Sequence, residues 1–385
     1  MLEQISPRLI LFFILYGVTG AVPFIAALYL LLRRGNAFAP DTTPPLRLRR
    51  WAASFFVLSA LGHVWWFLFY LHLRNFHSMD DVVRSAGYVA IVVFDCVTLL
   101  TTLAGTLLSM LQDRRRHIWP VFVAMIPFVA LGGVYMIYPS PTIMLIAPVY
   151  FLLLYALFTV YMIFAVRRYG RWLNDNYADL ENKKVWLSQV VTLACLLLLI
   201  LYILVDIDSI LLMYLMHFTE LVLFGLLLWR VETLPQLEER DVQEQTCTPS
   251  EPEISDLPLP PSPLIANINL DQMEQMLKEH CVDTLLYLQH DLTLHQLAQA
   301  IGTNRSYLSQ YFSRQGITYN TYINNLRINH FISRYQEAAK AGQPVVAQQL
   351  ASESGYRSYS TFSLAFKHRT GQSVTAWMRG GNLSV

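Results

Sequence analysis

Basic side chains gather in the last part of the chain. From Leu292 onward there are nine Lys and Arg residues against two acidic residues, a net charge of +7 where the whole chain carries only +1. The cations are Arg305, Arg314, Arg327, Arg334, Lys340, Arg357, Lys367, Arg369 and Arg379. Contact with a phosphate backbone requires such an excess of positive charge. For any single one of these side chains, a solvated surface position is the alternative interpretation.

Two similar segments would position these cations. The first reads LTLHQLAQAIGTNRSYLSQYFSRQG and the second PVVAQQLASESGYRSYSTFSLAFKHRTG. Three positions recur after 53 residues: Leu297, Ala298 and Gly302 match Leu350, Ala351 and Gly355. In each segment a short apolar helix ends at a Gly, which accepts the positive φ of a tight turn, and a second helix follows at once. The pattern predicts two helix-turn-helix units, whose second helices are the ones that can enter a major groove.

One long helix should join the two units, with Thr318 as its N-cap and an end near Ala341, before Gly342 and Pro344. It carries two apolar stripes, formed by Tyr319, Tyr322, Ile323 and Leu326 and by Ile328, Phe331, Ile332 and Tyr335. Nine helical steps turn the second stripe to the opposite side, so each end can pack on a different unit. The helix spans roughly 34 Å at ~1.5 Å per residue, close to one turn of DNA.

About 115 residues at the C-terminus resemble the AraC/XylS family of transcription regulators, most strongly in GYRSYSTFSLAFKHRTGQSVTAWMR. The resemblance implies a seven-helix domain that places two recognition helices in adjacent major grooves and helps to recruit RNA polymerase. Carried over by position, the base-facing residues are Ser306, Ser309 and Gln310, then Ser360, Thr361 and Leu364. The wider predicted DNA-binding set adds Asn304, Arg305, Tyr307, Arg314, Arg357, Ser358, Lys367 and His368. Leu364 stands where the family often has Arg, and Val374 where it usually has Pro.

The rest of the chain has the composition of a membrane protein, since 54% of all residues are hydrophobic and only 14% are charged. Seven apolar stretches each approach the ~20 residues that a helix needs to cross a bilayer. They are about Leu9 to Leu32, Trp51 to Leu73, Tyr88 to Leu111, Ile118 to Tyr138, Ile143 to Val166, Val185 to Val205 and Ser209 to Trp229. The first is too long for a secretion signal and lacks a clear cleavage site, so it should be a retained span.

These patterns predict an all-α chain of three parts. Residues 1–230 should form a seven-transmembrane helical bundle, residues 231–263 an acidic, Pro-rich flexible linker, and residues 264–385 the AraC-type domain. An amphipathic helix from Asn269 to about Gln289 should open that domain. Its expected core residues are Met273, Met276, Leu277, Leu285 and Leu288.

The distribution of charge predicts the orientation of the bundle. Thirteen Lys and Arg residues follow the first, third and fifth spans: Arg33, Arg34, Arg47, Arg49, Arg50, Arg114, Arg115, Arg116, Arg167, Arg168, Arg171, Lys183 and Lys184. The N-terminus and the other loops hold only Arg8, Arg74 and Arg84. The positive-inside rule therefore predicts an N-terminus outside a bacterial inner membrane and a C-terminus in the cytoplasm, where DNA is.

Four ionisable residues within the spans are candidates for sensing a signal: His63, Asp95, His217 and Glu220. Such groups are costly in a bilayer and face the bundle interior or a wet cavity. They would line a ligand site or titrate with pH, or else form interhelical hydrogen bonds that fix the packing. The four cysteines and the histidines lack metal-ligand spacing, and the common catalytic and nucleotide-binding motifs are missing. We therefore predict no metal, no cofactor and no enzymatic activity.

The leading hypothesis is a membrane-embedded one-component transcription regulator that binds promoter DNA under control of a signal sensed in the membrane domain. Its partners would be double-stranded DNA, RNA polymerase, the lipid bilayer, an unknown small-molecule or physical signal and a second copy of the chain in a homodimer. Pairing of membrane domains, release of the linker or rotation of the helices near Trp229 would each serve as the switch. The alternatives are a transporter or permease with a regulatory DNA-binding tail, and a membrane-anchored scaffold whose helix-turn-helix units bind protein.

Overall fold

The computed structural model describes residues 7–33, 35–40, 42–75, 81–205, 210–237 and 270–381. Regular structure in these ranges is helical without strands, as the all-α prediction requires. Most of the predicted linker, from residue 238 to residue 263, lies outside the described residues. By its contacts the chain divides into two compact units, residues 1–169 with 185–238, and residues 170–184 with 239–385. Each unit is described by itself.

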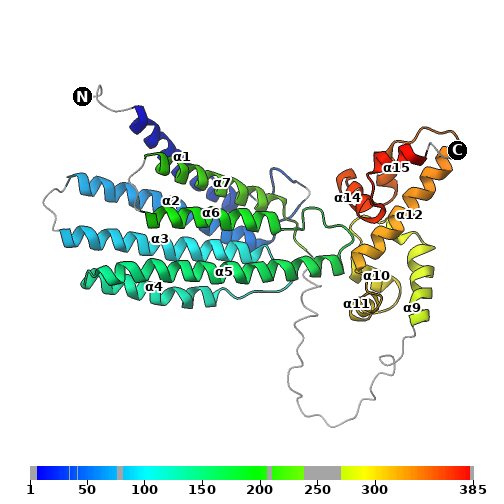
Figure 1. Ribbon diagram of the computed structural model, residues 1–385, viewed down its shortest axis with the longest axis horizontal. Helices are drawn as coiled ribbons and strands as arrows, with labels where there is room; N and C mark the ends of the chain where they lie inside the picture. Colours follow the sequence, from blue (N-terminus) through cyan, green and yellow to red (C-terminus); the bar gives the residue numbers. More distant parts are fainter. Residues whose placement is uncertain are drawn as a thin grey trace, which may run out of the picture. The chain divides into compact units, whose positions relative to one another are not determined.

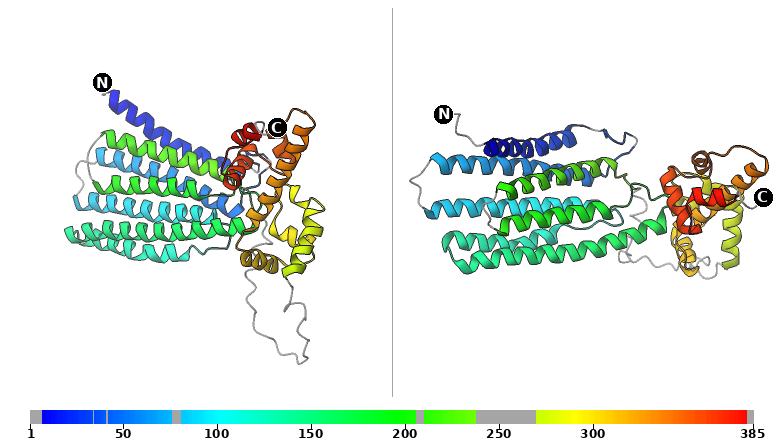
Figure 2. Two further views of the ribbon diagram at one scale, coloured as in Figure 1. Left: turned by 45° about the vertical axis from the view of Figure 1, so that its right-hand side comes forward. Right: turned by 45° about the horizontal axis from the view of Figure 1, so that its top comes forward.

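The first unit is a bundle of long apolar helices that lie side by side (Figures 1 and 2). They are α1 (Pro7–Leu32), α2 (Leu46–Asn75), α3 (Asp81–Ser109), α4 (Trp119–Ile137), α5 (Pro141–Asn176), α6 (Trp186–Val205) and α7 (Ile210–Thr233). Among the described residues, six helices are long and apolar enough to cross a membrane, all except α6. The corresponding apolar stretch of α6, Trp186–Tyr202, is shorter. Seven spans thus remain a prediction.

Small residues let neighbouring helices of the bundle approach closely. The ring of Trp51 in α2 fills the place beside Gly105 of α3, where an added Cβ would lie 2.4 Å from ring carbons. Gly132 of α4 makes similar room for Val93, at 2.6 Å. Close approach through glycine is typical of helices that pack by van der Waals contact in lipid.

Hydrogen bonds gather the start of α2 and the segments after α1, α3 and α7 at one end of the bundle. Asn36, after α1, donates to the carbonyl of Glu232 at 2.9 Å, and Gln112, after α3, donates to the carbonyl of Pro235 at 3.0 Å. The guanidinium of Arg47 donates to the carbonyl of Arg116. Two of the predicted basic segments therefore share one end of the bundle with the C-terminal end of α7.

The second unit is built around the long helix α12 (Tyr319–Lys340), which lies among the other helices of this unit in Figure 1. Before it come α9 (Leu270–Leu277), the π-helical turn η1 (Lys278–Val282), the 3-10 turn η2 (Leu286–Leu288), α10 (Leu294–Ala300) and α11 (Arg305–Arg314). After it come α13 (Ala347–Glu353), α14 (Tyr359–Thr370) and α15 (Val374–Gly381). The predicted N-cap is confirmed, since the side chain of Thr318 accepts a hydrogen bond from the backbone N–H of Thr321.

The prediction of one helix from Asn269 to Gln289 was wrong. The α-helix α9 ends at Leu277, the π-helical turn η1 follows it directly, and the separate 3-10 turn η2 comes before Gln289. The π-helical turn buries Cys281 fully in the core, and Cys281 was not among the core residues predicted from the sequence. Leu285 then adopts a left-handed φ of 56° and is 46% exposed rather than buried. Of the other expected core residues, Met273 and Leu277 are buried, while Met276 and Leu288 pack partly buried against the same cluster.

Two separate hydrophobic cores form, one for each helix-turn-helix unit. Tyr319 and Ile323, from the first half of α12, join the core of the first unit with Leu297, Leu308 and Phe312. Its second half contributes three residues to the other core: Ile328, Phe331 and Tyr335. The two apolar stripes predicted for the connecting helix are thus confirmed.

Candidate functional site

The first helix-turn-helix unit has its helix ends fixed by side chains. Thr293 and Gln296 form a capping box at the start of α10, since each side chain accepts from the backbone N–H of the other residue. Gly302 follows with a φ of 70°, which glycine adopts without strain. Asn304 then caps α11 by accepting from the N–H of Tyr307 at 2.8 Å. A cap of this kind typically contributes ~1 kcal/mol to helix stability.

The second unit repeats this arrangement with a tighter turn. Gly355 has a φ of 88°, and a Cβ at this position would lie 2.8 Å from the carbonyl oxygen of Leu288. Glycine is therefore required here both for its conformation and for its lack of a side chain. Ser358 caps α14 by accepting from the N–H of Thr361 at 3.3 Å. Positive φ at Gly302 and Gly355 confirms the turns predicted from the repeated sequence.

The second helices of both units present polar side chains to solvent. Among the predicted DNA-binding residues on α11, Ser306, Gln310 and Arg314 are exposed, and Tyr307 and Ser309 are partly exposed. On α14 and the turn before it, Arg357, Ser360, Leu364, Lys367 and His368 are exposed, while Ser358 and Thr361 are partly exposed. Leu364 is the most apolar of these and is 67% exposed. An exposed Leu on a recognition helix fits contact with a thymine methyl group.

Two of the predicted cations are not free to meet a phosphate in this structure. Arg305 is only 8% exposed, and its guanidinium donates to the side-chain oxygen of Asn176 at 2.9 Å and 2.7 Å. Arg327 is 1% exposed and donates to the carbonyls of Tyr287 and Gln289, at 2.7 Å each. Burial lowers the pKa of this guanidinium below its usual range. Arg327 therefore has a structural role that the count of basic residues did not reveal.

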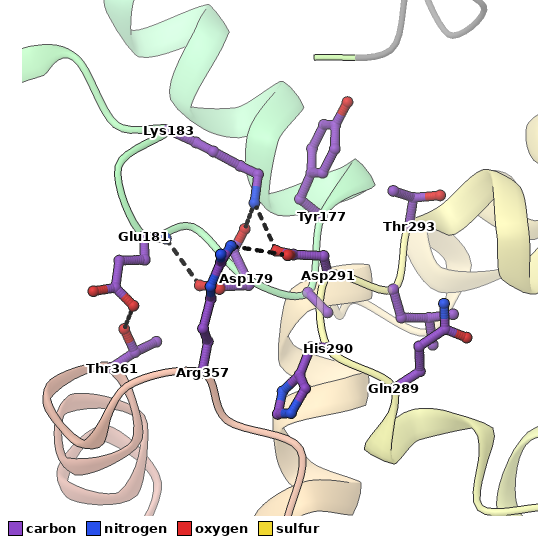
Figure 3. A network of polar contacts seen from close by, with 12 residues as sticks. Tyr177, Asp179, Glu181, Lys183, Gln289, His290, Asp291, Thr293, Arg357 and Thr361 are labelled. Carbon is purple, nitrogen blue, oxygen red and sulfur yellow. Dashed lines mark hydrogen bonds and ion pairs between the residues drawn. The ribbon is translucent and has the colours of Figure 1, made fainter. Parts of the chain in front are cut away.

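Residues Asn176–Lys183, here called the docking segment, lie against both helix-turn-helix units (Figure 3). Tyr177 forms an isolated antiparallel bridge with Thr293, and the N–H of Ala178 donates to the carbonyl of Leu292 at 3.3 Å. Asn320 of α12 donates to the carbonyls of Tyr177 and Ala178 at 3.1 Å and 2.7 Å. These backbone contacts fix the docking segment beside the start of α10.

Charged side chains extend this contact to the second unit. Lys183 lies 3.2 Å from a carboxylate oxygen of Asp291, whose other oxygen lies 3.3 Å from Arg357. The carboxylate of Glu181 accepts from the hydroxyl of Thr361 at 3.2 Å, as Figure 3 shows. From its charge, this stretch was predicted only to be a basic loop. The apolar pair Tyr177 and Ala178 within a polar stretch was the available signal, since Ala178 is buried in the first core.

Within the bundle, three of the four predicted sensing residues come together. His63 of α2 and His217 of α7 each lie near one carboxylate oxygen of Glu220, at 3.5 Å and 3.3 Å. Thr19 of α1 joins them, with its hydroxyl 3.1 Å from His63 and 3.3 Å from His217. Asp95 lies apart from these direct contacts and accepts from the indole N–H of Trp66 at 2.7 Å. Thr19 was missed because hydroxyl residues are common in membrane helices.

Comparison with known proteins agrees with the geometry of the second unit. A family model described as a helix-turn-helix domain matches residues 297–380, which cover α11 to α14 and most of α10 and α15. No curated protein and no solved structure gives a significant match. Residues 297–380 thus form a helix-turn-helix domain, and this match supports the resemblance to the DNA-binding domain of AraC-type transcription regulators.

Proposed function

We propose that the chain is a membrane-embedded one-component transcription regulator, in which the helical bundle senses a signal and the AraC-type domain binds promoter DNA. The observation that carries this proposal is the presence of two capped recognition helices, α11 and α14, in a chain whose other helices are long and strongly apolar. A lipid-embedded bundle accounts for the large apolar side chains on its outer surface, such as Ile25, Leu145 and Phe164.

The orientation follows from charge. Basic segments after α1 and α3 share one end of the bundle with the last turn of α7, the helix that precedes the DNA-binding domain in the sequence. Placed on the cytoplasmic side, this end satisfies the positive-inside rule and gives the domain access to DNA. Seven spans, with α6 crossing as well, put the N-terminus outside. A bacterial inner membrane is the compartment that meets both conditions.

Two kinds of side chain would recognise DNA: cations that contact phosphates, and polar or apolar groups that contact base edges. Arg314, Arg357 and Lys367 supply charge for phosphates, which positions the domain without selecting a sequence. Ser306, Ser309, Gln310, Ser360, Thr361 and Leu364 supply the groups that read base edges. RNA polymerase and a second copy of the chain complete the proposed assembly at a promoter.

Genome-wide crosslinking of the tagged full-length chain to DNA in its host tests the DNA-binding half of this proposal. Sequences recovered at discrete promoters, and lost when Lys367 and Arg314 are both changed to Ala, are the expected result. Topology reporters fused after residue 385 and at residue 140, in the segment between α4 and α5, test the membrane half. A cytoplasmic signal at residue 385 with a periplasmic signal at residue 140 is expected. A periplasmic C-terminus would refute the proposal.

A further inference from the structure

The four side chains that meet inside the bundle, Thr19, His63, His217 and Glu220, bring two ring nitrogens and two oxygens into one small space. His63 Nδ1 lies 2.9 Å from the carbonyl oxygen of Ser59, which only accepts hydrogen bonds, so this nitrogen carries the proton. In the neutral imidazole, Nε2 then has a lone pair. That lone pair faces a carboxylate oxygen of Glu220 at 3.5 Å, an arrangement that repels unless a cation lies between them.

The hydroxyl of Thr19 adds a further lone pair to the same space. Its oxygen lies 3.0 Å from the carbonyl of Tyr16 and 3.1 Å from that of Leu15, so its single proton can be donated to the backbone. The remaining lone pairs face His63 Nε2 and His217 Nδ1. Protons on Nε2 of His63 and on Nδ1 of His217 would satisfy these contacts by hydrogen bonding, so a hydrogen-bonded cluster is the alternative that a binding experiment must separate from a metal site.

The separations match those around a tetrahedral metal ion. Two ligands that each lie ~2.05 Å from such an ion are ~3.3 Å apart. Four of the six ligand-to-ligand distances in such a site are 3.1, 3.3, 3.3 and 3.5 Å, and the nitrogens of His63 and His217 lie within 4.8 Å of each other. The hydrogen bond from His63 to Ser59 also has the form of the outer-shell contact that orients a metal-binding histidine.

We propose that His63, His217 and Glu220 bind a divalent first-row transition metal ion, with Zn²⁺ as the best fit, and that Thr19 completes the tetrahedron. Two imidazoles and one carboxylate are a common zinc set, and the buried position of Thr19 and His217 shields the ion from solvent. Helices α1, α2 and α7 supply one or two ligands each, so the bound ion would fix their packing. The site goes beyond the proposed function, which specifies no ligand.

Metal binding is measured on the full-length chain in detergent, purified with a streptavidin-binding tag to avoid a polyhistidine tag and stripped with a chelator. Co²⁺ serves as the probe because its visible absorption distinguishes tetrahedral from octahedral coordination. We expect one Co²⁺ per chain with a tetrahedral spectrum, displaced by one equivalent of Zn²⁺. Glu220→Gln keeps the shape of the side chain and should weaken binding at least tenfold, and His217→Ala should weaken it by about 100-fold or more.

His117→Ala is the matched control, because His117 is exposed between α3 and α4 and should not alter the affinity. Far-UV circular dichroism of each variant establishes that the bundle has folded. Either of two results would overturn the proposal and leave a hydrogen-bonded cluster. One is a Co²⁺ affinity of Glu220→Gln equal to that of wild type, and the other is a Co²⁺ spectrum without tetrahedral bands. The DNA-binding function does not depend on this result.

The docking segment carries a second, independent inference. It engages Arg305 at the start of α11 through Asn176, and Thr361 on α14 through Glu181. Both partners belong to the predicted DNA-binding set, and one lies on each recognition helix. Glu181 also adds a carboxylate next to a surface that must accept phosphates, and such like-charge contact with DNA is unfavourable.

We infer that the docking segment holds the DNA-binding domain in a state of low affinity, and that DNA and this segment compete for Arg305 and Thr361. The inference rests on the proposed function, because it describes how DNA binding is regulated. Because the segment begins at Asn176, the last residue of α5, movement of that helix is a physical means of withdrawing it. The competing contacts are few, a buried one to Arg305 and a partly buried one to Thr361, so a change of several-fold in affinity is the expected scale.

Fluorescence anisotropy with a labelled, random-sequence 40-bp duplex at low salt tests this inference on the full-length chain in nanodiscs. Glu181→Gln and Asn176→Ala should each bind this duplex about three- to tenfold more tightly than wild type. Asn174→Ala is the control, since Asn174 lies on the same helix and donates to the carbonyl of Gly170 within it. Equal affinities in wild type and both variants would refute the inference while leaving the proposed function intact. Absence of binding in all proteins would refute both.

Discussion

The guanidinium of Arg327 lies over the ring of Tyr356, with 5.6 Å between the guanidinium carbon and the ring centroid. Arg327 is on the connecting helix α12, and Tyr356 lies in the turn of the second helix-turn-helix unit. The same guanidinium donates to the carbonyls of Tyr287 and Gln289, which precede the first unit. One buried side chain therefore joins three segments of the DNA-binding domain.

Replacing Arg327 by Met should destabilise the domain strongly. Methionine has a similar length, but it leaves the buried carbonyl of Tyr287 without its donor, at a cost of roughly 1–3 kcal/mol, and also removes the partly buried bond to Gln289. Hydrogen exchange of α12 in the full-length chain should accelerate correspondingly. Arg334→Met is the control, because Arg334 forms an exposed pair with Glu337 and should change stability by less than about 1 kcal/mol. Equal exchange in both variants would contradict the role given to Arg327.

The two turn glycines should respond differently to the same substitution. Gly302→Ala places a Cβ in open space at a φ of 70°, which costs roughly 1–2 kcal/mol of conformational strain. Gly355→Ala adds contact at 2.8 Å with the carbonyl of Leu288 and at 3.0 Å with Arg327. We therefore expect a clearly larger loss of stability from Gly355→Ala, measured by exchange of α12 and α14. A larger loss from Gly302→Ala would refute this account of the turn.

Periodicity and repeats were sufficient to predict the local parts of this fold. The cap at Thr318, the two stripes of α12 and the positive φ of Gly302 depend on residues close together in sequence. The π-helical turn at Lys278–Val282 was not predicted, because its apolar spacing is also compatible with a continuous helix. Tertiary packing of Cys281 in the core accompanies the irregular conformation there.

Contacts between distant segments of the chain were beyond the sequence pattern. Thr19, His63 and Glu220 are separated by up to about 200 residues, so no local sequence spacing predicts that they meet. The one part of this group visible from sequence was the pair His217 and Glu220, which lie three positions apart on α7. Likewise, nothing near Arg305 indicated that Asn176 would cover it.

Lys367 and Leu364 should contribute to DNA binding in different ways. Lys367→Ala removes a charge, so it should weaken binding to all sequences alike and reduce the dependence of log K on log salt by about 0.9. Leu364→Ala removes an apolar surface, so it should leave the salt dependence unchanged and lower the preference for sites with thymine at the contacted position. Anisotropy titrations of promoter fragments at several salt concentrations measure both effects. A change in salt dependence for Leu364→Ala would contradict this division.

Stability of the DNA-binding domain should depend on pH through His330. Its ring nitrogen lies 3.3 Å from the hydroxyl of Tyr287, and Arg334, Glu337 and Glu353 act on it electrostatically. Burial, with a smaller contribution from Arg334, lowers the pKa of His330 below its usual 6.5. Between the folded pKa and about 6.5 the unfolded chain binds more protons, so stability increases with pH in this window and is constant above it.

His330→Gln should therefore reduce the loss of stability between about pH 6.5 and pH 5, although carboxylates shared by both proteins will still contribute. The effect should be smaller than the roughly 1.4 kcal/mol of a full-unit shift, because the side chain is only partly buried and solvent screens its neighbours. Hydrogen exchange of α12, corrected for the intrinsic pH dependence of exchange, measures the difference between variant and wild type. An identical decline in both proteins would show that His330 does not account for the acid sensitivity of this domain.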